Sequence, residues 1–371
     1  MQEQELTAWL SLSLGSGLPS RQLLGLLAHF PSPRALLEMP LKELQPNLVA
    51  PIKAVRAACR AQGVQGRVMQ ALKWQEQKDC HILSLDSPHY PGLLREIADP
   101  PVLLYVQGHA EALSLPQLAI VGSRKPSPGG REMARLLAGD LSKAGFSICS
   151  GLALGIDTES HQGALAVKGV SVAVLGSGLD RVYPRQNQVL ARDLRERGAL
   201  VSEYPLGAAA QAWHFPQRNR VISGLSRGVL VVEAAQKSGS LITAHCALEQ
   251  GREVFAVPGS PFNPQSRGCH SLLKNGAALV ESVRDIAEEL GGFCTNADIS
   301  AAALLTDRMT QLSQPARNLL GCLDANWASM DTLVLRSGLP VEQVLATLSE
   351  LEIYRLIEAG PEGYSLSLRR A

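Results

Sequence analysis

The fold of this chain is decided by the segment LAIVGSRK at residues 118–125. Four apolar residues are followed at once by a glycine, a serine and two cations. An apolar run that ends in a glycine turn is typical of a strand in a parallel sheet, because both faces of such a sheet are covered. Ligands of these sheets bind beyond the carboxyl ends of the strands, so the turn that follows Val121 is a candidate binding loop.

Further apolar runs alternate with helical stretches on the C-terminal side of this segment. They lie at residues 146–149, 170–175, 200–201, 228–232 and 253–257. The alternation predicts βαβ units, and therefore an α/β fold with a Rossmann-like, doubly wound, mainly parallel sheet. Residues 81–85 and 102–106 are predicted to add two strands at one edge of this sheet.

The regions on either side of the sheet have different patterns. We predict a helical domain at residues 1–65, the Rossmann-like domain at 66–292, a linker at 293–312 and a winged-helix-like domain at 313–371. In the first region a leucine-rich helical face at residues 23–27 follows a glycine turn at residues 15–19. Two interpretations remain open: a small helical bundle, or a SAM or helix-hairpin-helix module whose glycine turn approaches a phosphate backbone.

The last region reads as three helices and a short hairpin at residues 356–366, an order that suits a winged helix. Its third helix, at residues 341–351, is predicted to carry Val344, Leu345, Leu348 and Leu351 on one face. This helix carries glutamates at 342 and 350 but neither lysine nor arginine. A helix that reads DNA needs cations for the phosphates, so a protein-contact role is favoured for this domain.

Composition limits the function classes. Hydrophobic residues make up 46% of the chain, aromatic residues only 4%, and the formal net charge is +1. A nucleic-acid site must then be a local cluster of cations, and a broad aromatic stacking platform is disfavoured. The seven cysteines are scattered without a CxxC pair, which predicts no zinc site and a reducing compartment. With neither a signal-peptide pattern nor a membrane-spanning run, we expect a cytoplasmic protein that binds no membrane. We also expect no cofactor.

The loops after the predicted strands share an unusual composition of glycine, serine and threonine. They lie at residues 122–125, 150–157, 176–180, 237–244 and 258–260. Glycine lets the backbone approach a ligand, and hydroxyl groups and helix N-terminal amides receive anions. Ser240 is predicted to cap the following helix. Because parallel strands bring all these loops to one rim, the sequence predicts a ligand that carries phosphate.

Cations near the same rim support this prediction. The segment FPQRNR at residues 215–220 places Arg218 and Arg220 on either side of Asn219. Together with Arg124 and Lys237, these arginines are predicted to neutralise phosphates, and bases would lie loosely against the few aromatic residues.

Nucleotide-using enzymes are the main alternative. The turn at residues 176–178 begins like GxGxxG, but residue 181 is arginine where a third glycine belongs, and the chain has no GxxxxGK[ST] motif. LOG-type phosphoribohydrolases resemble the predicted fold, yet their PGGxGTxxE motif is missing. A scaffold that binds only proteins would bind no phosphate at all.

Acid or base groups for catalysis are few. Asp157, Glu159 and His161 follow the second strand of the parallel series, where local capping is a more common role than general-base catalysis. Glu203 and Glu233 follow the fourth and fifth strands. They suit acid–base work, but we favour a structural role in which they pair with Arg218 and Arg220.

Taken together, these motifs resemble the bacterial DNA-processing family DprA, also called Smf. The resemblance is dense over residues 80–290 and is carried by VGSR at 121–124, SGLA at 150–153, GID at 155–157, YP at 183–184, SEYP at 202–205, FPQRNR at 215–220, SGSLITA at 238–244 and VPG at 257–259.

This resemblance implies a non-enzymatic protein that binds single-stranded DNA without sequence preference. It also implies a homodimer that loads the RecA recombinase onto DNA taken up in natural transformation. The predicted DNA-binding residues are Gly122, Ser123, Arg124, Gly151, Gly176, Gly178, Arg218, Asn219, Arg220, Lys237, Ser238, Gly239, Ser240 and Thr243. The alternative is a nucleotide-binding enzyme of the LOG type.

Overall fold

A parallel sheet is the centre of the computed structural model, which describes residues 2–290, 313–320, 322–323, 327–353, 357–360 and 363–366. Within these residues the sheet has nine strands in the order β1-β2-β6-β5-β4-β3-β7-β8-β9. The strands are β1 Cys80–Ser84, β2 Leu103–Gly108, β3 Gln117–Val121, β4 Ser147–Ser150, β5 Ser171–Val174, β6 Ala199–Ser202, β7 Gly228–Val231, β8 Glu253–Ala256 and β9 Ala278–Leu279. The predicted linker at 293–312 lies outside the described residues.

The strand directions confirm the predicted Rossmann-like sheet. Strands β3 to β9 pair in parallel, whereas β1 and β2 pair antiparallel and extend one edge as expected. Strand β3 lies between β4 and β7, with Ala119 beside Cys149 on one side and Val229 on the other. The chain leaves β3 toward β6 and returns to β7, so the topological switch point lies between β3 and β7.

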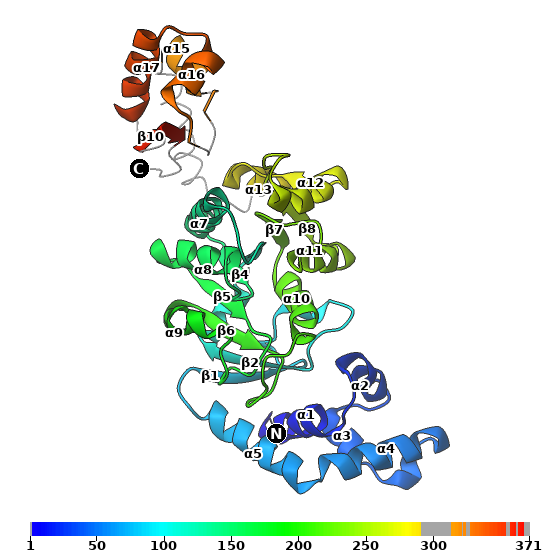
Figure 1. The fold of residues 1–371 in the computed structure, drawn as a ribbon. Coiled ribbons are helices and arrows are strands. Elements are labelled where there is room, and N and C mark those ends of the chain that lie inside the picture. Colours follow the sequence, from blue (N-terminus) through cyan, green and yellow to red (C-terminus); the bar gives the residue numbers. More distant parts are fainter. Residues whose placement is uncertain are drawn as a thin grey trace.

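Helices cover both faces of the sheet, which explains why the strands are continuously apolar (Figure 1). In β3, Leu118 and Ile120 pack with α7 (Pro128–Lys143) and α8 (Ile156–Ala166). Ala119 and Val121 face the opposite side, where the covering helices are α10 (His214–Leu225), α11 (Ser240–Glu249) and α12 (Arg267–Lys274). The helix α13 (Val283–Glu289) joins the first face, and α9 (Gln188–Arg197) covers β5 and β6.

The N-terminal helices pack against the β1–β2 edge rather than standing apart. They are α1 Gln2–Gly15, α2 Ser20–Leu27, α3 Pro33–Glu38, α4 Pro46–Cys59 and α5 Gln62–Gln75. Helix α5 runs through the predicted boundary at 65, because Val64, Val68, Ala71 and Trp74 bury one continuous face. The helical region therefore extends to Gln75. The indole of Trp9 donates a hydrogen bond to Asp86 at 2.9 Å, and both regions contribute to one hydrophobic cluster.

The predicted glycine turn joins α1 to α2 and serves packing within the helical region. Gly17 has a φ of +68°, which side chains other than glycine rarely adopt. A Cβ on Gly15 would lie 2.8 Å from the Cα of Cys59, so Gly15 allows α1 to approach α4 closely.

The C-terminal region has its own small core. Helices α15 (Gln314–Leu320), α16 (Met330–Ser337) and α17 (Val341–Ile353) precede an antiparallel hairpin of β10 (Ile357–Gly360) and β11 (Gly363–Leu366). Of the four residues on the predicted apolar face, Val344, Leu348 and Leu351 are buried, whereas Leu345 is 46% exposed. Thr347 is buried on the inner face of the helix instead. Among all described residues, no helix is both long and apolar enough to cross a membrane.

Substitutions of Tyr105 on β2 test the core that the N-terminal helices share with the sheet. Its ring packs against Trp74 with centroids 6.0 Å apart, and its buried hydroxyl has no hydrogen-bond partner among the described residues. We expect Tyr105→Ala to lower the free energy of unfolding by about 3–5 kcal/mol, because it leaves a cavity. Tyr105→Phe removes only the unpaired hydroxyl, so it should raise the free energy of unfolding by about 1 kcal/mol. Urea denaturation measures both, and a destabilised Tyr105→Phe would show that the hydroxyl has a partner.

Candidate nucleic-acid interface

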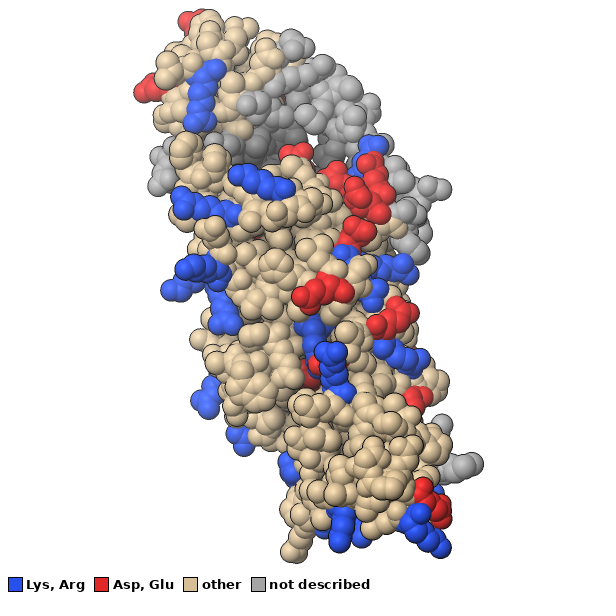
Figure 2. Space-filling view, turned by 90° about the vertical axis from the view of Figure 1, so that its right-hand side faces the viewer, with Lys and Arg blue, Asp and Glu red and all other residues tan. Residues whose placement is uncertain are grey.

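One rim of the sheet carries the predicted loops, because the strands that precede them are parallel. The side chains of Arg124, Lys125 and Lys237 are exposed on these loops. Arg181 and Arg185, which the sequence analysis missed, are exposed in the segment after β5. The sequence feature that could have identified these two arginines is their position just beyond the turn at residues 178–180. On the face shown in Figure 2, basic side chains are spread over the surface, while acidic ones in the central part gather mainly toward the right-hand side.

Arg218 is not one of the exposed cations of the rim. It is only 4% exposed, and its Nη1 donates a hydrogen bond to the carbonyl of Val174 at 2.7 Å. The guanidinium lies directly against Gly151, where a Cβ would overlap it. Burial lowers the pKa of Arg218, while the nearby Asp157 carboxylate raises it. The prediction that Arg218 meets a phosphate at the surface is therefore corrected: its charge is used inside the protein, beneath the loop after β4.

Arg220 is also held internally. Its Nη1 and Nη2 donate to the two carboxylate oxygens of Glu203 at 3.0 and 2.7 Å, and its Nε donates to Asp99 at 3.1 Å. Burial opposes the charge, but Glu203 and Asp99 raise the pKa of Arg220. The predicted pairing of Glu203 with an arginine is confirmed, and Arg220 is corrected from a phosphate ligand to a partly buried, ion-paired structural cation.

Asn219 joins α10 to the loop after β7. Its Nδ2 donates to the carbonyl of Gly239 at 3.3 Å. In that loop, Ser238 Oγ accepts from the Ser240 amide at 3.3 Å. Ser240 is the first helical residue of α11 and Gly239 occupies the cap position, so the predicted cap was one residue too late. Lys237 and Gly239 are exposed, whereas Thr243 is buried and faces the interior.

The other predicted glycines allow loops to approach one another. A Cβ on Gly176 would lie 3.1 Å from the ring of Phe215, and one on Gly178 would lie 2.5 Å from the Pro205 carbonyl. A Cβ on Gly122 would lie 2.6 Å from Ile156. Ser123 is buried, and its hydroxyl accepts from the Lys125 amide at 3.1 Å. These residues shape the rim from within, while Gly239 has open space around it.

A small aromatic cluster lies beside Arg124. The Arg124 guanidinium is 5.6 Å from the ring centroid of Phe215, and that ring is 5.6 Å from Tyr183. Tyr183 is 50% exposed and Trp213, next to this cluster in sequence, is 60% exposed. The low aromatic content did not predict this grouping, which arises because the segments after β5 and β6 meet at the start of α10. Exposed rings beside a cation provide surfaces on which bases stack.

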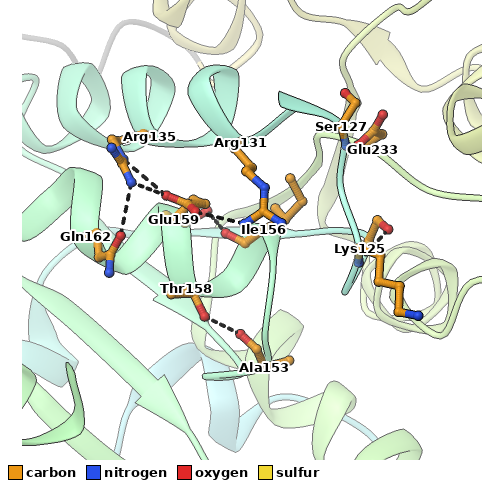
Figure 3. A network of polar contacts seen from close by, with 12 residues as sticks. Lys125, Ser127, Arg131, Arg135, Ala153, Ile156, Thr158, Glu159, Gln162 and Glu233 are labelled. Atoms are coloured by element: carbon orange, nitrogen blue, oxygen red, sulfur yellow. Dashed lines mark hydrogen bonds and ion pairs between the residues drawn. The ribbon is translucent and has the colours of Figure 1, made fainter. Parts of the chain in front are cut away.

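The residues considered for acid–base chemistry have internal partners. The Asp157 carboxylate accepts hydrogen bonds from the amides of Gly151 and Ala153 at 3.1 and 3.2 Å. Glu159 accepts from Arg131 and Arg135 of α7, as Figure 3 shows. Asp157 therefore has the local bonding that the sequence favoured, whereas Glu159 pairs with arginines of a neighbouring helix, 28 and 24 residues away.

His161 is completely buried, and burial lowers its pKa to about 3. Its Nδ1 lies 2.7 Å from Ser171 Oγ. The Ser171 hydroxyl donates to the Ile148 carbonyl, so Nδ1 carries the proton and donates to Ser171. A neutral, enclosed imidazole has no access to a substrate.

Glu233 differs from the prediction that it pairs with Arg218 or Arg220. Its Oε2 accepts from the Ser127 amide at 2.8 Å, and its Oε1 accepts from Asn263 Nδ2 at 2.9 Å. The carboxylate therefore joins the loops after β3, β7 and β8. No group of three or more His, Cys, Asp or Glu side chains suited to a metal ion occurs in the part of the chain that the structure describes.

A Rossmann-like sheet with basic and aromatic groups on its rim, followed by the helices α15 to α17 and a hairpin, defines a class of multidomain Rossmann-like proteins. The chain belongs to one family of this class, DNA recombination-mediator protein A, whose sequence pattern matches residues 81–291. The DprA winged helix domain matches residues 306–363. The family assignment from sequence motifs is thereby confirmed.

Relatives and solved structures agree with this family. Protein Smf of Escherichia coli is 46% identical over 306 residues, which is 82% of either chain. The X-ray structure of DprA from Streptococcus pneumoniae has a TM-score of 0.63 and 39% identity, and the match covers 75% of this chain and 95% of that one. A structure that describes the single-stranded DNA binding mode of DprA from Helicobacter pylori has a TM-score of 0.53 and 28% identity, over 58% of this chain and 98% of that one.

The contact between Gly151 and Arg218 makes a sharp stability prediction. We expect Gly151→Ala to lower the free energy of unfolding by about 3 kcal/mol, because the new methyl group displaces a buried guanidinium. Gly239→Ala is the matched control and should change it by less than about 0.5 kcal/mol, since that site is open and its φ is −63°. In an Arg218→Met background the cost of Gly151→Ala should fall, and an unchanged cost in urea denaturation would refute the contact.

The buried His161 predicts a pH dependence of stability. Its folded pKa of about 3 lies below the ordinary histidine pKa of about 6.5, so protons favour the unfolded chain. This contribution to stability is complete above the unfolded pKa and is lost as the pH falls toward 3. Between pH 7 and 5 the native chain should lose about 2 kcal/mol more than His161→Asn, measured by urea denaturation at both pH values. Equal losses would show that His161 is protonated or accessible in the folded state.

Proposed function

We propose that this chain binds single-stranded DNA without sequence preference along the rim of its sheet. The observation that supports this proposal is that exposed cations and exposed aromatic rings lie on the loops of one rim. Arg124 and Lys237 follow β3 and β7, on the two sides of the switch point, and Tyr183 follows β5. The structure of the Helicobacter pylori relative, described for its single-stranded DNA binding mode, adds support.

In this mechanism the phosphates contact Arg124, Lys125 and Lys237, with Arg181 and Arg185 extending the path. The exposed backbone around Gly239 and the hydroxyl of Ser238 offer short-range contacts to the same phosphates. Bases stack on Tyr183 and Trp213, which accept any base because every base has a π-face. Arg218, Asn219 and Arg220 act by fixing the loops. Sequence preference is small because stacking and phosphate contacts carry no base identity.

The finer role follows from the family resemblance. The protein acts as a cytoplasmic homodimer that loads RecA onto the bound strand during natural transformation, and it catalyses no reaction. The enclosed imidazole of His161 and the internally bonded Asp157 and Glu159 support a non-catalytic role over the LOG-type alternative.

Charge reversal of the exposed cations tests the DNA site. The fluorescence anisotropy of a labelled, unstructured oligonucleotide is measured at several salt concentrations with the native chain and with Arg124→Glu/Lys237→Glu. We expect the variant to bind at least about tenfold more weakly. The slope of log K against log salt should become shallower by about 1.4, because each neutralised phosphate contributes roughly 0.7.

The matched control is Lys78→Glu/Lys168→Glu, which reverses two exposed lysines that precede β1 and β5. Both lie at the amino-terminal ends of the strands, on the side of the sheet away from the rim. It should bind like the native chain. Equal binding by both double variants, or no binding by the native chain, would reject the rim as a DNA site. Release of a free base from a nucleoside monophosphate would instead support the enzyme alternative.

A further inference from the structure

The switch point between β3 and β7 is where Rossmann-like sheets usually receive a phosphate. In such folds the phosphate lies against the N-terminus of the helix that follows the first strand, where amides point outward. Here that helix is α7, which begins at Pro128 after the cap residue Ser127. Its first turn contains Gly129 and Gly130, so these two positions present no side chain to a ligand.

The carboxylate of Glu233 already occupies this position. Its Oε2 accepts the hydrogen bond of the Ser127 amide at 2.8 Å. A Cβ on Gly130 would lie 2.5 Å from the same oxygen, so the carboxylate rests on the first turn of α7. Figure 3 shows Glu233 beside Ser127 at the start of this helix. With 4% of its surface exposed, Glu233 fills the site rather than bordering it.

The partners of Glu233 are those that a bound anion would have. In the described part of the chain its carboxylate is held by neutral N–H donors, the Ser127 amide and the Asn263 side chain, and forms no ion pair with lysine or arginine. Amides at a helix N-terminus stabilise a negative charge through their aligned dipoles. Glu233 therefore takes the role that a ligand phosphate has in related sheets.

The backbone of Glu233 closes the same crevice. The Ser123 amide donates to the Glu233 carbonyl at 2.6 Å, which joins the loops after β3 and β7. A Cβ on Gly122 would lie 2.8 Å from that carbonyl oxygen. The space in which a nucleotide would lie between these two loops is thus taken by the chain itself.

We infer that Glu233 is a specificity-determining residue that keeps the phosphates of free nucleotides out of the switch point. A second anion there would meet the carboxylate at contact distance and would compete for the Ser127 amide and the Asn263 side chain. Phosphates then bind only at the outer parts of the rim, where a ligand that carries several phosphates makes more contacts than a free nucleotide does. This inference does not rest on the proposed function, because it concerns the exclusion of small anions whatever the rim binds.

The test uses inorganic pyrophosphate and AMP as probes of the intact chain, with isothermal titration calorimetry and the shift in Tm as readouts. The native chain should show no saturable binding of either probe. Glu233→Gln removes the charge, and Glu233→Ser also removes the bulk. We expect each to bind pyrophosphate saturably, with a Kd at least about tenfold below the highest concentration at which the native chain shows no binding, because a like charge at about 4 Å costs more than the ~1.4 kcal/mol that this factor represents.

The matched control is Glu253→Gln, which changes an exposed glutamate at the start of β8. This residue lies at the amino-terminal ends of the strands, away from the rim. It makes the same charge change and should leave pyrophosphate binding unchanged. Saturable binding to the native chain, or a folded Glu233→Ser that gains no affinity, overturns the inference. If neither variant folds, hydrogen exchange of the native chain decides: protection of the Ser127 and Gly130 amides by pyrophosphate overturns it, and unchanged exchange supports it.

Discussion

The buried guanidinium of Arg218 holds the centre of the rim together. From α10 it reaches the end of β5 through the Val174 carbonyl and lies against Gly151 after β4. The Asp157 carboxylate that compensates its charge is itself fixed by two amides of the same loop. A buried charge must be paired and hydrogen-bonded, so these elements can be arranged in few other ways. With α10 fixed, Asn219 reaches the loop after β7 and Arg220 reaches Glu203 and Asp99.

Charged residues on the rim fall into two groups with different tasks. Arg218 and Glu233 are buried, Arg220 is partly buried and ion-paired, and all three set the relative positions of loops, whereas Arg124, Lys125 and Lys237 are exposed and available to a ligand. The first group contributes to affinity only through geometry. The second contributes through charge, which salt screens. The net charge of the chain is only +1. A local positive potential at the rim therefore comes from the exposed cations, because the charges of the internally paired arginines are balanced by nearby carboxylates.

The sequence predicted the sheet well because buried parallel strands leave a direct signal in apolar runs. It missed β9, which has only two residues and an exposed Leu279, so it has no such run. The sequence motifs located the rim but did not predict how far each side chain is buried. Arg218 and Lys237 belong to equally polar segments, yet Arg218 is buried and Lys237 is exposed. Depth follows from how α10 packs, which requires long-range contacts. The partner of Glu233 was missed for the same reason, since Ser127 is 106 residues away.

The outer strands of the sheet bear on how the protein behaves at high concentration. An uncovered edge strand exposes unpaired amides that can recruit a strand from another molecule and so begin aggregation. At one edge, the side chain of Gln75 accepts a hydrogen bond from the Ile82 amide of β1 at 3.2 Å, so the end of α5 blocks that strand. At the other edge, β9 is too short to act as a template. The sheet is thereby protected at both ends from intermolecular strand addition.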